Sequence, residues 1–198
     1  MQYVNTELKV LFIVPEIRLD SAPNHFPFWA VILGAIVEKK GGQIGILDLN
    51  ALRMKYGGRL VPDKIIEEEI RLEKWDLIGI GGLTSTYSRI KQLTPLIRKS
   101  SPDSIFIGGG GWATYNPDEI LQLVPEIDMI CIGEGEETFS ELYDEINQGT
   151  QDFEKVNGLC LRDDETFKFT KPRALISDLD TIPYPAYDLI ETDIYFEH

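Results

Sequence analysis

Short apolar runs alternate with longer mixed segments along the first 150 residues of the chain. Five runs are rich in Val, Ile and Leu, which is typical of strands buried on both faces of a sheet: 8–14, 43–49, 76–80, 104–107 and 128–132. Segments of helical length lie between and after them: 28–40, 62–73, about 87–99, one beginning near 117, and 136–147. Strands that alternate with helices form βαβ units. The pattern therefore predicts an α/β fold with a doubly wound, five-stranded parallel sheet, flavodoxin-like or Rossmann-like.

Turn-forming residues mark the boundaries of these segments. The stretch 15–27 begins and ends with proline and contains further turn-forming residues, so we expect a loop there. Residues 48–59 are expected to be irregular, and Pro95 is expected to kink or interrupt its helix. Asn116 is a candidate N-cap for the helix that begins near Pro117.

The C-terminal part of the chain has a different pattern. Residues 158–162 and 166–170 alternate between apolar and polar side chains and are separated by acidic residues, which indicates a β-hairpin. The proline-rich segment 178–188 is typical of a linker. We therefore expect an α/β domain in residues 1–150, followed by a hairpin extension and linker in residues 151–198.

Charge and cysteine content exclude several classes of function. The chain of 198 residues carries a formal net charge of −14, whereas nucleic acids and anionic membranes bind clustered Lys and Arg, so we expect neither as a partner. The longest apolar stretch, 26–37, is too short to span a bilayer, and the N-terminus lacks a signal-peptide pattern. Cys131 and Cys160 indicate neither a disulfide scaffold nor a zinc site, and they fit a cytoplasmic protein.

Three loops that follow predicted strands carry candidate chemistry, because parallel strands place their carboxyl ends on one edge of a sheet. The glycines 108–111 would let a ligand approach the backbone, but such a run is as common in ordinary tight turns and lacks the spacing of a P-loop or dinucleotide fingerprint. The sequence Gly-Glu-Gly-Glu-Glu-Thr at 133–138 combines a tight turn with acidic residues that suit a helix start. The hydroxyls of Thr84 and Ser85 either cap a helix or contact a ligand.

His25 is the only histidine inside the chain, and it lies in the first loop, on the same predicted edge. It is a candidate metal ligand or general base, although an ordinary surface histidine is the commoner case for a lone residue. No Ser/His/Asp set, carboxylate pair or metal cluster can be assembled from the other residues.

The motifs form an ordered series along the chain: Val14-Pro15, Leu33-Gly34-Ala35, Gly41-Gly42, Gly81-Gly82-Leu83-Thr84-Ser85, Gly109-Gly110 with Thr114 and Pro117, and Gly133-Glu134-Gly135-Glu136. This series resembles the N-terminal cobalamin-binding domain of B12-dependent radical-SAM enzymes. The hairpin at 158–162 and the segment 179–189 also resemble the bridge to the catalytic barrel of that family. The resemblance covers nearly the whole chain.

The chain lacks two motifs, one of that family and one of classical B12 enzymes. There is no Cys-x3-Cys-x2-Cys motif, so the resemblance implies that a 4Fe-4S cluster and S-adenosylmethionine belong to a separate C-terminal radical-SAM barrel, the expected partner of this chain. We therefore expect an excised domain or a stand-alone relative. There is also no Asp-x-His-x-x-Gly motif, which supplies a lower histidine ligand in classical B12 methyltransferases and mutases. His25 lies in the corresponding loop, and cobalt ligation by a histidine stays open.

The resemblance implies that the chain binds cobalamin and catalyses nothing alone, while the parent enzyme uses the cofactor for methyl transfer or cobalamin-assisted radical chemistry. The implied binding residues are Thr84, Ser85, Gly109, Gly110, Gly111, Trp112, Thr114, Gly133, Glu134 and Gly135, with His25 as a candidate lower ligand of cobalt. Two alternatives are a related interaction domain that no longer binds cobalamin, and a nucleotide or nucleotide-sugar binding domain.

Overall fold

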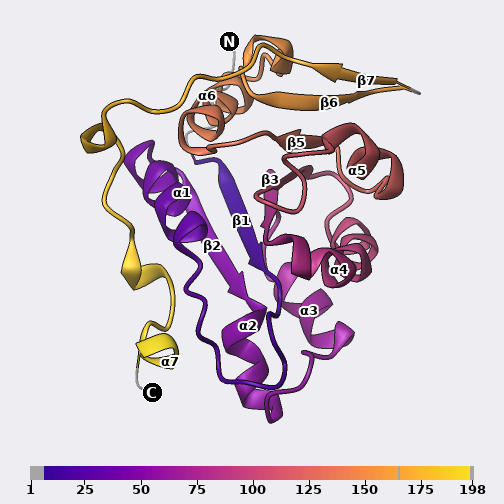
Figure 1. The fold of residues 1–198 in the computed structure, drawn as a ribbon, viewed down its shortest axis with the longest axis vertical. Coiled ribbons are helices and arrows are strands. Elements are labelled where there is room, and N and C mark those ends of the chain that lie inside the picture. The colour runs from indigo at the N-terminus through magenta and orange to yellow at the C-terminus, as the bar shows by residue number, and fades with distance from the viewer. Residues whose placement is uncertain (1–6, 165, 197–198) are drawn as a thin grey trace.

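A computed structural model describes residues 7–164 and 166–196 of the chain. Its centre is one sheet with the strand order β2-β1-β3-β4-β5-β6-β7 (Figure 1). Five strands are parallel: β1 Lys9–Val14, β2 Gln43–Asp48, β3 Leu77–Gly81, β4 Ile105–Gly109 and β5 Met129–Cys131. Two further strands are antiparallel: β6 Leu159–Asp163 and β7 Thr166–Phe169. The order of the first five strands is that of flavodoxin-like folds, which confirms the predicted fold class.

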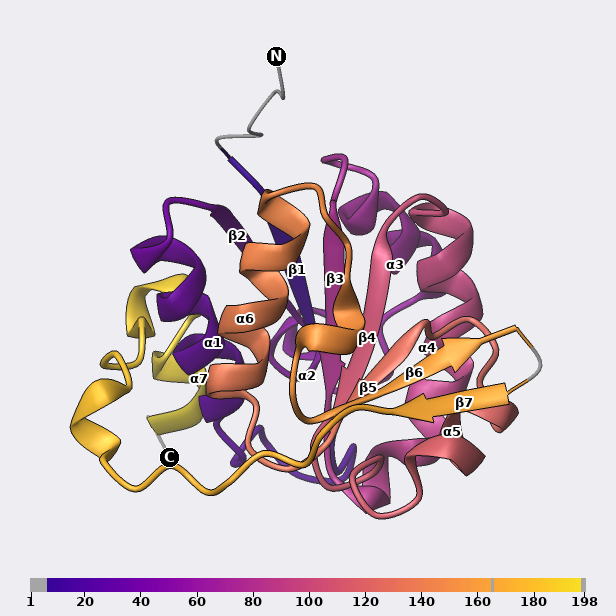
Figure 2. The same cartoon turned by 90° about the horizontal axis from the view of Figure 1, so that it is seen from above.

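Helices cover both faces of the sheet. The α-helices are α1 Phe28–Lys39, α2 Leu49–Leu52, α3 Asp63–Ile70, α4 Tyr87–Ser100, α5 Pro117–Leu123, α6 Glu136–Asn147 and α7 Asp193–Phe196. Short 3-10 helices are η1 Arg53–Tyr56, η2 Thr84–Thr86, η3 Phe153–Lys155, η4 Leu179–Thr181 and η5 Tyr187–Leu189. Figure 2 shows α1 and α6 on one side of the sheet and α3, α4 and α5 on the other. None of the helices in the described ranges is long and apolar enough to cross a membrane.

The two faces arise from the alternation of side chains along each strand. In β1, Val10, Phe12 and Val14 belong to the apolar cluster under α1 and α6. Leu11 and Ile13 point the other way, into the cluster under α3 and α4. All five side chains are buried, so β1 carries the continuous apolar run that a central parallel strand requires.

The predicted sheet of five strands was wrong in one respect, because the C-terminal hairpin continues the sheet. Strand β6 pairs with β5 through the register Ile130↔Cys160, and β7 pairs with β6. Without β6, the amide and carbonyl groups along one side of β5 would have no hydrogen-bond partner in the sheet. Pairing with β6 satisfies these groups and covers the edge. The sheet therefore has seven strands. The predicted division of the chain into a domain of residues 1–150 and an extension of residues 151–198 stays a prediction.

Three local expectations also differ from the structure. The segment expected to be irregular contains α2 and η1, since the Asp48 carboxylate accepts the backbone N–H of Ala51 at 3.0 Å and caps α2. Pro95 lies inside α4 without ending it. Asn116 occupies the N-cap position of α5, but its side chain donates to Glu119 at 3.3 Å instead of accepting from the backbone.

The segment after the hairpin runs along the outer side of α1 (Figure 1). The Ala186 N–H donates to the carbonyl of Val31 at 3.1 Å. A Cβ on Gly34 would lie 2.6 Å from Leu189 Cδ1, so the glycine allows this segment to contact the helix directly. At its end, the Tyr195 hydroxyl donates to Asp48 at 2.7 Å. The proline-rich segment is thus packed on the α/β domain, with two 3-10 turns in it.

Candidate functional site

A cavity of about 340 Å³ lies at the carboxyl edge of the sheet. Its walls come from the ends of β1, β3, β4 and β5 and from the first turns of α1 and α6. Most of the lining is apolar or glycine, and the large apolar side chains are Phe12, Val14, Ile17, Trp29, Leu33, Ile80, Leu83, Ile107 and Phe139. The volume lies in the range of small-molecule sites, and this edge is where open α/β sheets bind ligands.

Glycines make the space in which these rings and loops pack. A Cβ on Gly81 would lie 2.6 Å from Cε2 of Trp29, so β3 has room for the indole only because the side chain is absent. Gly110 has a φ of +91°, a conformation that favours glycine, and a Cβ there would lie 2.8 Å from the carbonyl oxygen of Gly82. The loops after β3 and β4 are therefore in direct backbone contact beside the cavity.

Seven of the residues predicted from the sequence line the cavity: His25, Gly109, Gly110, Gly111, Gly133, Glu134 and Gly135. They come from three loops, the β1–α1, β4–α5 and β5–α6 loops, which the topology brings to one edge. At Gly111 and Gly133 a Cβ would meet no atom within 4 Å, so the backbone faces open space there. The expectation that the glycine loops meet at one edge is therefore met by the structure.

Two predicted threonines join these loops to each other and do not line the cavity. The Thr84 hydroxyl donates to the carbonyl of Gly111 at 3.2 Å. The Thr114 hydroxyl donates to the carbonyl of Gly110 at 3.0 Å and accepts the N–H of Gly133 at 3.3 Å. Both side chains thereby fix the spacing of the glycine loops.

Ser85 and Trp112 lie outside the lining. Ser85 is exposed within η2. Trp112 is buried in the cluster under α4 and α5, with its ring centroid 6.2 Å from that of Tyr87. It supports Gly108 from the face of the sheet opposite the cavity, since a Cβ on Gly108 would lie 2.9 Å from its ring.

The titratable groups at the cavity offer little reactive chemistry. His25 is exposed at the rim, and no cluster of three or more His, Cys, Asp or Glu that could hold a metal ion occurs within residues 7–164 and 166–196. Cys131 lies in the wall, where burial raises the pKa of its thiol to about 11, so the thiol is neutral at physiological pH. The Glu134 carboxylate accepts the N–H of Ile176 at 3.0 Å, which ties the segment after the hairpin to the rim.

The sequence reasoning missed the apolar wall of the cavity. Trp29 and Leu33 lie one turn apart on α1, and Pro15 and Ile17 come from the first loop. One signal was available: α1 is apolar nearly all round, which indicates contacts on more than the sheet-facing side. The pattern alone gives no indication that part of this surface faces a cavity.

Solved structures with this fold include two enzymes. One is the radical S-adenosylmethionine methyltransferase TsrM from Kitasatospora setae with cobalamin and a [4Fe-4S] cluster bound (TM-score 0.70, 19% identity, covering 92% of this chain and 32% of TsrM). The other is the cobalamin-dependent S-adenosylmethionine radical enzyme OxsB with aqua-cobalamin and S-adenosylmethionine bound (TM-score 0.75, 15% identity, covering 94% of this chain and 25% of OxsB). At these identities the likeness shows the fold.

Sequence comparison identifies the family. A curated relative, the anaerobic magnesium-protoporphyrin IX monomethyl ester cyclase of Synechocystis sp., is 38% identical over 104 residues, which are 52% of this chain and 21% of the cyclase. The chain thus spans a third or less of the length of each of these three proteins. The family model of the B12 binding domain matches residues 17–143, which include the glycine loops and most of the cavity lining. This match confirms the resemblance inferred from the motifs, and the chain belongs to the B12 binding domain family.

Proposed function

We propose that this chain binds cobalamin at the carboxyl edge of its sheet, with the corrin ring over the glycine loops and the nucleotide tail in the cavity. The observation that carries the proposal is the apolar cavity bordered by exposed glycine backbone at that edge, within the stretch that matches the B12 binding domain. The cobalamin-bound relatives of the same fold support it.

The residues present suit this cofactor. A cavity of about 340 Å³ is too small to enclose a corrin ring together with its tail, so the ring would lie outside, over Gly111 and Gly133, where the backbone is open. The rings of Phe12, Trp29 and Phe139 supply the apolar surroundings that an aromatic base prefers. Exposed backbone N–H groups of the loops would serve the amide and phosphate oxygens of the cofactor.

His25 is the candidate lower ligand of cobalt. It is exposed at the rim of the cavity, and only its neutral imidazole would coordinate a metal. The assignment rests on its place in the first loop. A His25→Ala variant tests it, because the positions of the corrin bands change when a nitrogen ligand is removed.

For the whole protein we propose a B12-dependent radical-SAM enzyme. The relatives of known structure carry their B12 domain in chains of about three to four times the matched length, and their 4Fe-4S cluster or S-adenosylmethionine is bound in the same proteins. The partner of this chain would then be the radical-SAM barrel of its own parent protein. Methyl transfer or cobalamin-assisted radical chemistry would take place between the two, and this chain alone would catalyse nothing.

A titration tests cobalamin binding directly. Reduced protein is titrated with hydroxocobalamin, and a saturable shift of the corrin bands is expected. The Gly111→Trp variant should abolish the shift, because an indole at this position would cover the mouth of the cavity, and its Cβ would meet no atom within 4 Å. The matched control is Gln122→Trp on the exposed surface of α5.

The outcomes separate the proposal from its alternatives. A shift that Gln122→Trp retains and Gly111→Trp loses supports the cofactor site. If wild-type protein takes up no corrinoid, the proposal is contradicted, and the first alternative remains, an interaction domain that no longer binds cobalamin. Binding of a nucleotide or nucleotide sugar in place of a corrinoid would favour the second alternative.

A further inference from the structure

A buried arginine contacts the backbone of the first loop and does not line the cavity. Arg53 in η1 is 1% exposed. Its guanidinium donates to the carbonyl oxygens of Arg18 at 3.3 Å, Ser21 at 2.6 Å and Gly58 at 3.1 Å, and its Nε donates to Asn50 Oδ1 at 3.2 Å. Two of these four acceptors belong to the loop itself, so the arginine binds loop backbone.

This arrangement is energetically demanding. Burying a charged group costs free energy unless it is paired and hydrogen-bonded. Within residues 7–164 and 166–196, Arg53 forms no ion pair, and its partners are carbonyl and amide oxygens. Burial of a cation among neutral acceptors is favourable only while every acceptor keeps its position, because each lost hydrogen bond leaves part of the charge unsolvated. Arg53 therefore stabilises the loop conformation in which the Arg18 and Ser21 carbonyls point toward it.

The loop shape that Arg53 holds is unusual. Arg18 has a φ of +54°, a left-handed conformation that non-glycine residues rarely adopt. The carbonyl of Arg18 is one of the two loop oxygens that Arg53 binds. Next to it, the N–H of Ile17 donates to Asn50 Oδ1 at 3.1 Å, the same oxygen that accepts from Arg53.

A second buried pair fixes the start of the loop. The Glu16 side chain is fully buried and accepts from Arg89 at 2.7 and 2.9 Å and from the N–H of Val61 at 3.1 Å. Its neighbours in the chain, Pro15 and Ile17, line the cavity. The side chains of residues 15–17 therefore alternate in direction: Pro15 and Ile17 form part of the cavity wall, and Glu16 makes the buried polar contacts.

We propose that Arg53 is a positioning residue for the cofactor site. Together with Asn50 and the Glu16–Arg89 pair, Arg53 holds the first loop in the shape that forms the cavity wall. The inference rests on the proposed function, because the ligand whose site Arg53 would preform is the cobalamin proposed above. Arg53 itself does not line the cavity, and it acts through the backbone of the loop. Preforming the wall removes the entropy cost of ordering the loop on binding.

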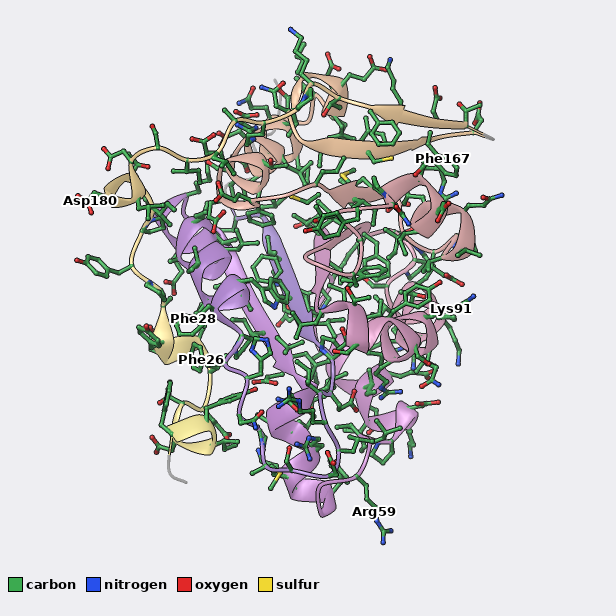
Figure 3. All side chains as sticks on the ribbon, in the orientation of Figure 1. Phe26, Phe28, Arg59, Lys91, Phe167 and Asp180 are labelled. Atoms are coloured by element: carbon green, nitrogen blue, oxygen red, sulfur yellow. The ribbon has the colours of Figure 1, made fainter. Side chains whose placement is uncertain are left out.

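The test compares three variants of the 198-residue chain. Arg53→Met removes the guanidinium and keeps an unbranched side chain. Arg53→Lys keeps the charge but has its donors on a single nitrogen, so it cannot reach the loop carbonyls and the Gly58 carbonyl together. The matched control is Arg59→Met, six residues along the same connection, where the side chain points away from the molecule (Figure 3) and the residue is exposed.

Two measurements are made on each variant. Limited trypsin digestion without corrinoid follows cleavage after Arg18 by mass spectrometry, because the scissile carbonyl is one that Arg53 holds and proteases cut released loops. Hydroxocobalamin titration gives the dissociation constant. For Arg53→Met we expect cleavage after Arg18 at least about tenfold faster and binding about tenfold weaker, the effect of losing charged hydrogen bonds. Arg53→Lys should lie between, and Arg59→Met should match wild type.

The outcomes distinguish a failure of the proposed role of Arg53 from a failure of the proposed function. A folded Arg53→Met protein, checked by circular dichroism, with wild-type cleavage at Arg18 and wild-type affinity would overturn the inference and leave the proposed function intact. If Arg53→Met does not fold, the same criterion applies to Arg53→Lys. Wild-type protein that binds no hydroxocobalamin would overturn the proposed function and with it the role of Arg53 toward the cofactor.

Discussion

At the scale of single residues, the site depends on absent side chains as much as on present ones. Gly81 allows the Trp29 indole to lie against β3, and Gly110 allows two loops to touch. Threonine hydroxyls at Thr84 and Thr114 then hold the loops at a fixed spacing. The shape of this edge is therefore determined mainly by the course of the backbone.

Replacing Gly81 with alanine should destabilise the protein. The added Cβ would lie 2.6 Å from the Trp29 ring, so the indole must move out of its position in the cavity wall. Forcing extra volume into packed surroundings costs about 1–3 kcal/mol. Urea unfolding would measure the loss, and Gly111→Ala, where a Cβ meets open space, is the control that should change stability little.

The Cys131 thiol should be unreactive at neutral pH. Burial raises its pKa to about 11 from an ordinary value of 9.0, so only the protonated form is populated near pH 8. Because the folded-state pKa is raised, the related stability is complete below pH 9 and is lost as the pH rises toward 11. Iodoacetamide labelling of a Cys160→Ala variant should be slow at pH 8 and rise steeply above pH 10. Rapid labelling of the folded Cys160→Ala variant at pH 8 would contradict this.

At the scale of elements, the sequence predicted the five parallel strands to within about two residues at each end, because the apolar runs are continuous and the turns between them are rich in Gly and Pro. It did not place the hairpin in the sheet, since a period-two pattern identifies a strand but not its neighbour. The strand pattern placed the glycine loops at one edge of the sheet, whereas their assignment as binding residues came from the family resemblance and stays a prediction. The wall formed by Trp29, Leu33 and Ile17 was missed because it depends on tertiary contacts.

The C-terminal segment should stabilise the edge of the sheet at β2. Asp48, at the end of β2, has a pKa raised by burial, and the hydrogen bond from Tyr195 opposes that rise. Tyr195→Phe removes the bond and should cost about 1–2 kcal/mol near neutral pH, where the carboxylate is ionised. Because the hydrogen bond from Tyr195 lowers the pKa of Asp48, it stabilises the ionised carboxylate more than the protonated acid, so the cost of Tyr195→Phe should shrink as the pH falls and Asp48 becomes protonated.

Urea unfolding of wild type and Tyr195→Phe between pH 4 and pH 8 gives this difference directly. A suitable control is Tyr184→Phe, because Tyr184 is 94% exposed in the same segment. An equal cost for Tyr195→Phe at every pH would show that the hydroxyl does not act through the ionised Asp48 carboxylate.

At the scale of the whole molecule, the cavity, the first loop and the C-terminal segment form one connected structure. Arg53 holds the first loop from below, and Phe26 near the end of that loop packs against Tyr187, Tyr195 and Phe196 of the C-terminal segment, with ring centroids 5.4–5.6 Å apart. Glu134 links the same segment to the opposite rim. The C-terminal segment thus contacts the first loop at Phe26 and the cavity rim at Glu134, so a ligand bound in the cavity should stabilise the fold as a whole.

Cobalamin should therefore raise the temperature of global unfolding. A ligand that binds only the folded state at a hundredfold excess over its dissociation constant stabilises it by about 2.7 kcal/mol. For a chain of this length each kcal/mol shifts the midpoint by about 2–4 °C, so a rise of roughly 5–10 °C is expected. Thermal unfolding followed by circular dichroism with and without hydroxocobalamin measures it. Gly111→Trp should show no rise and Gln122→Trp the full rise. An equal rise in both variants would mean that the corrinoid binds elsewhere than over the glycine loops.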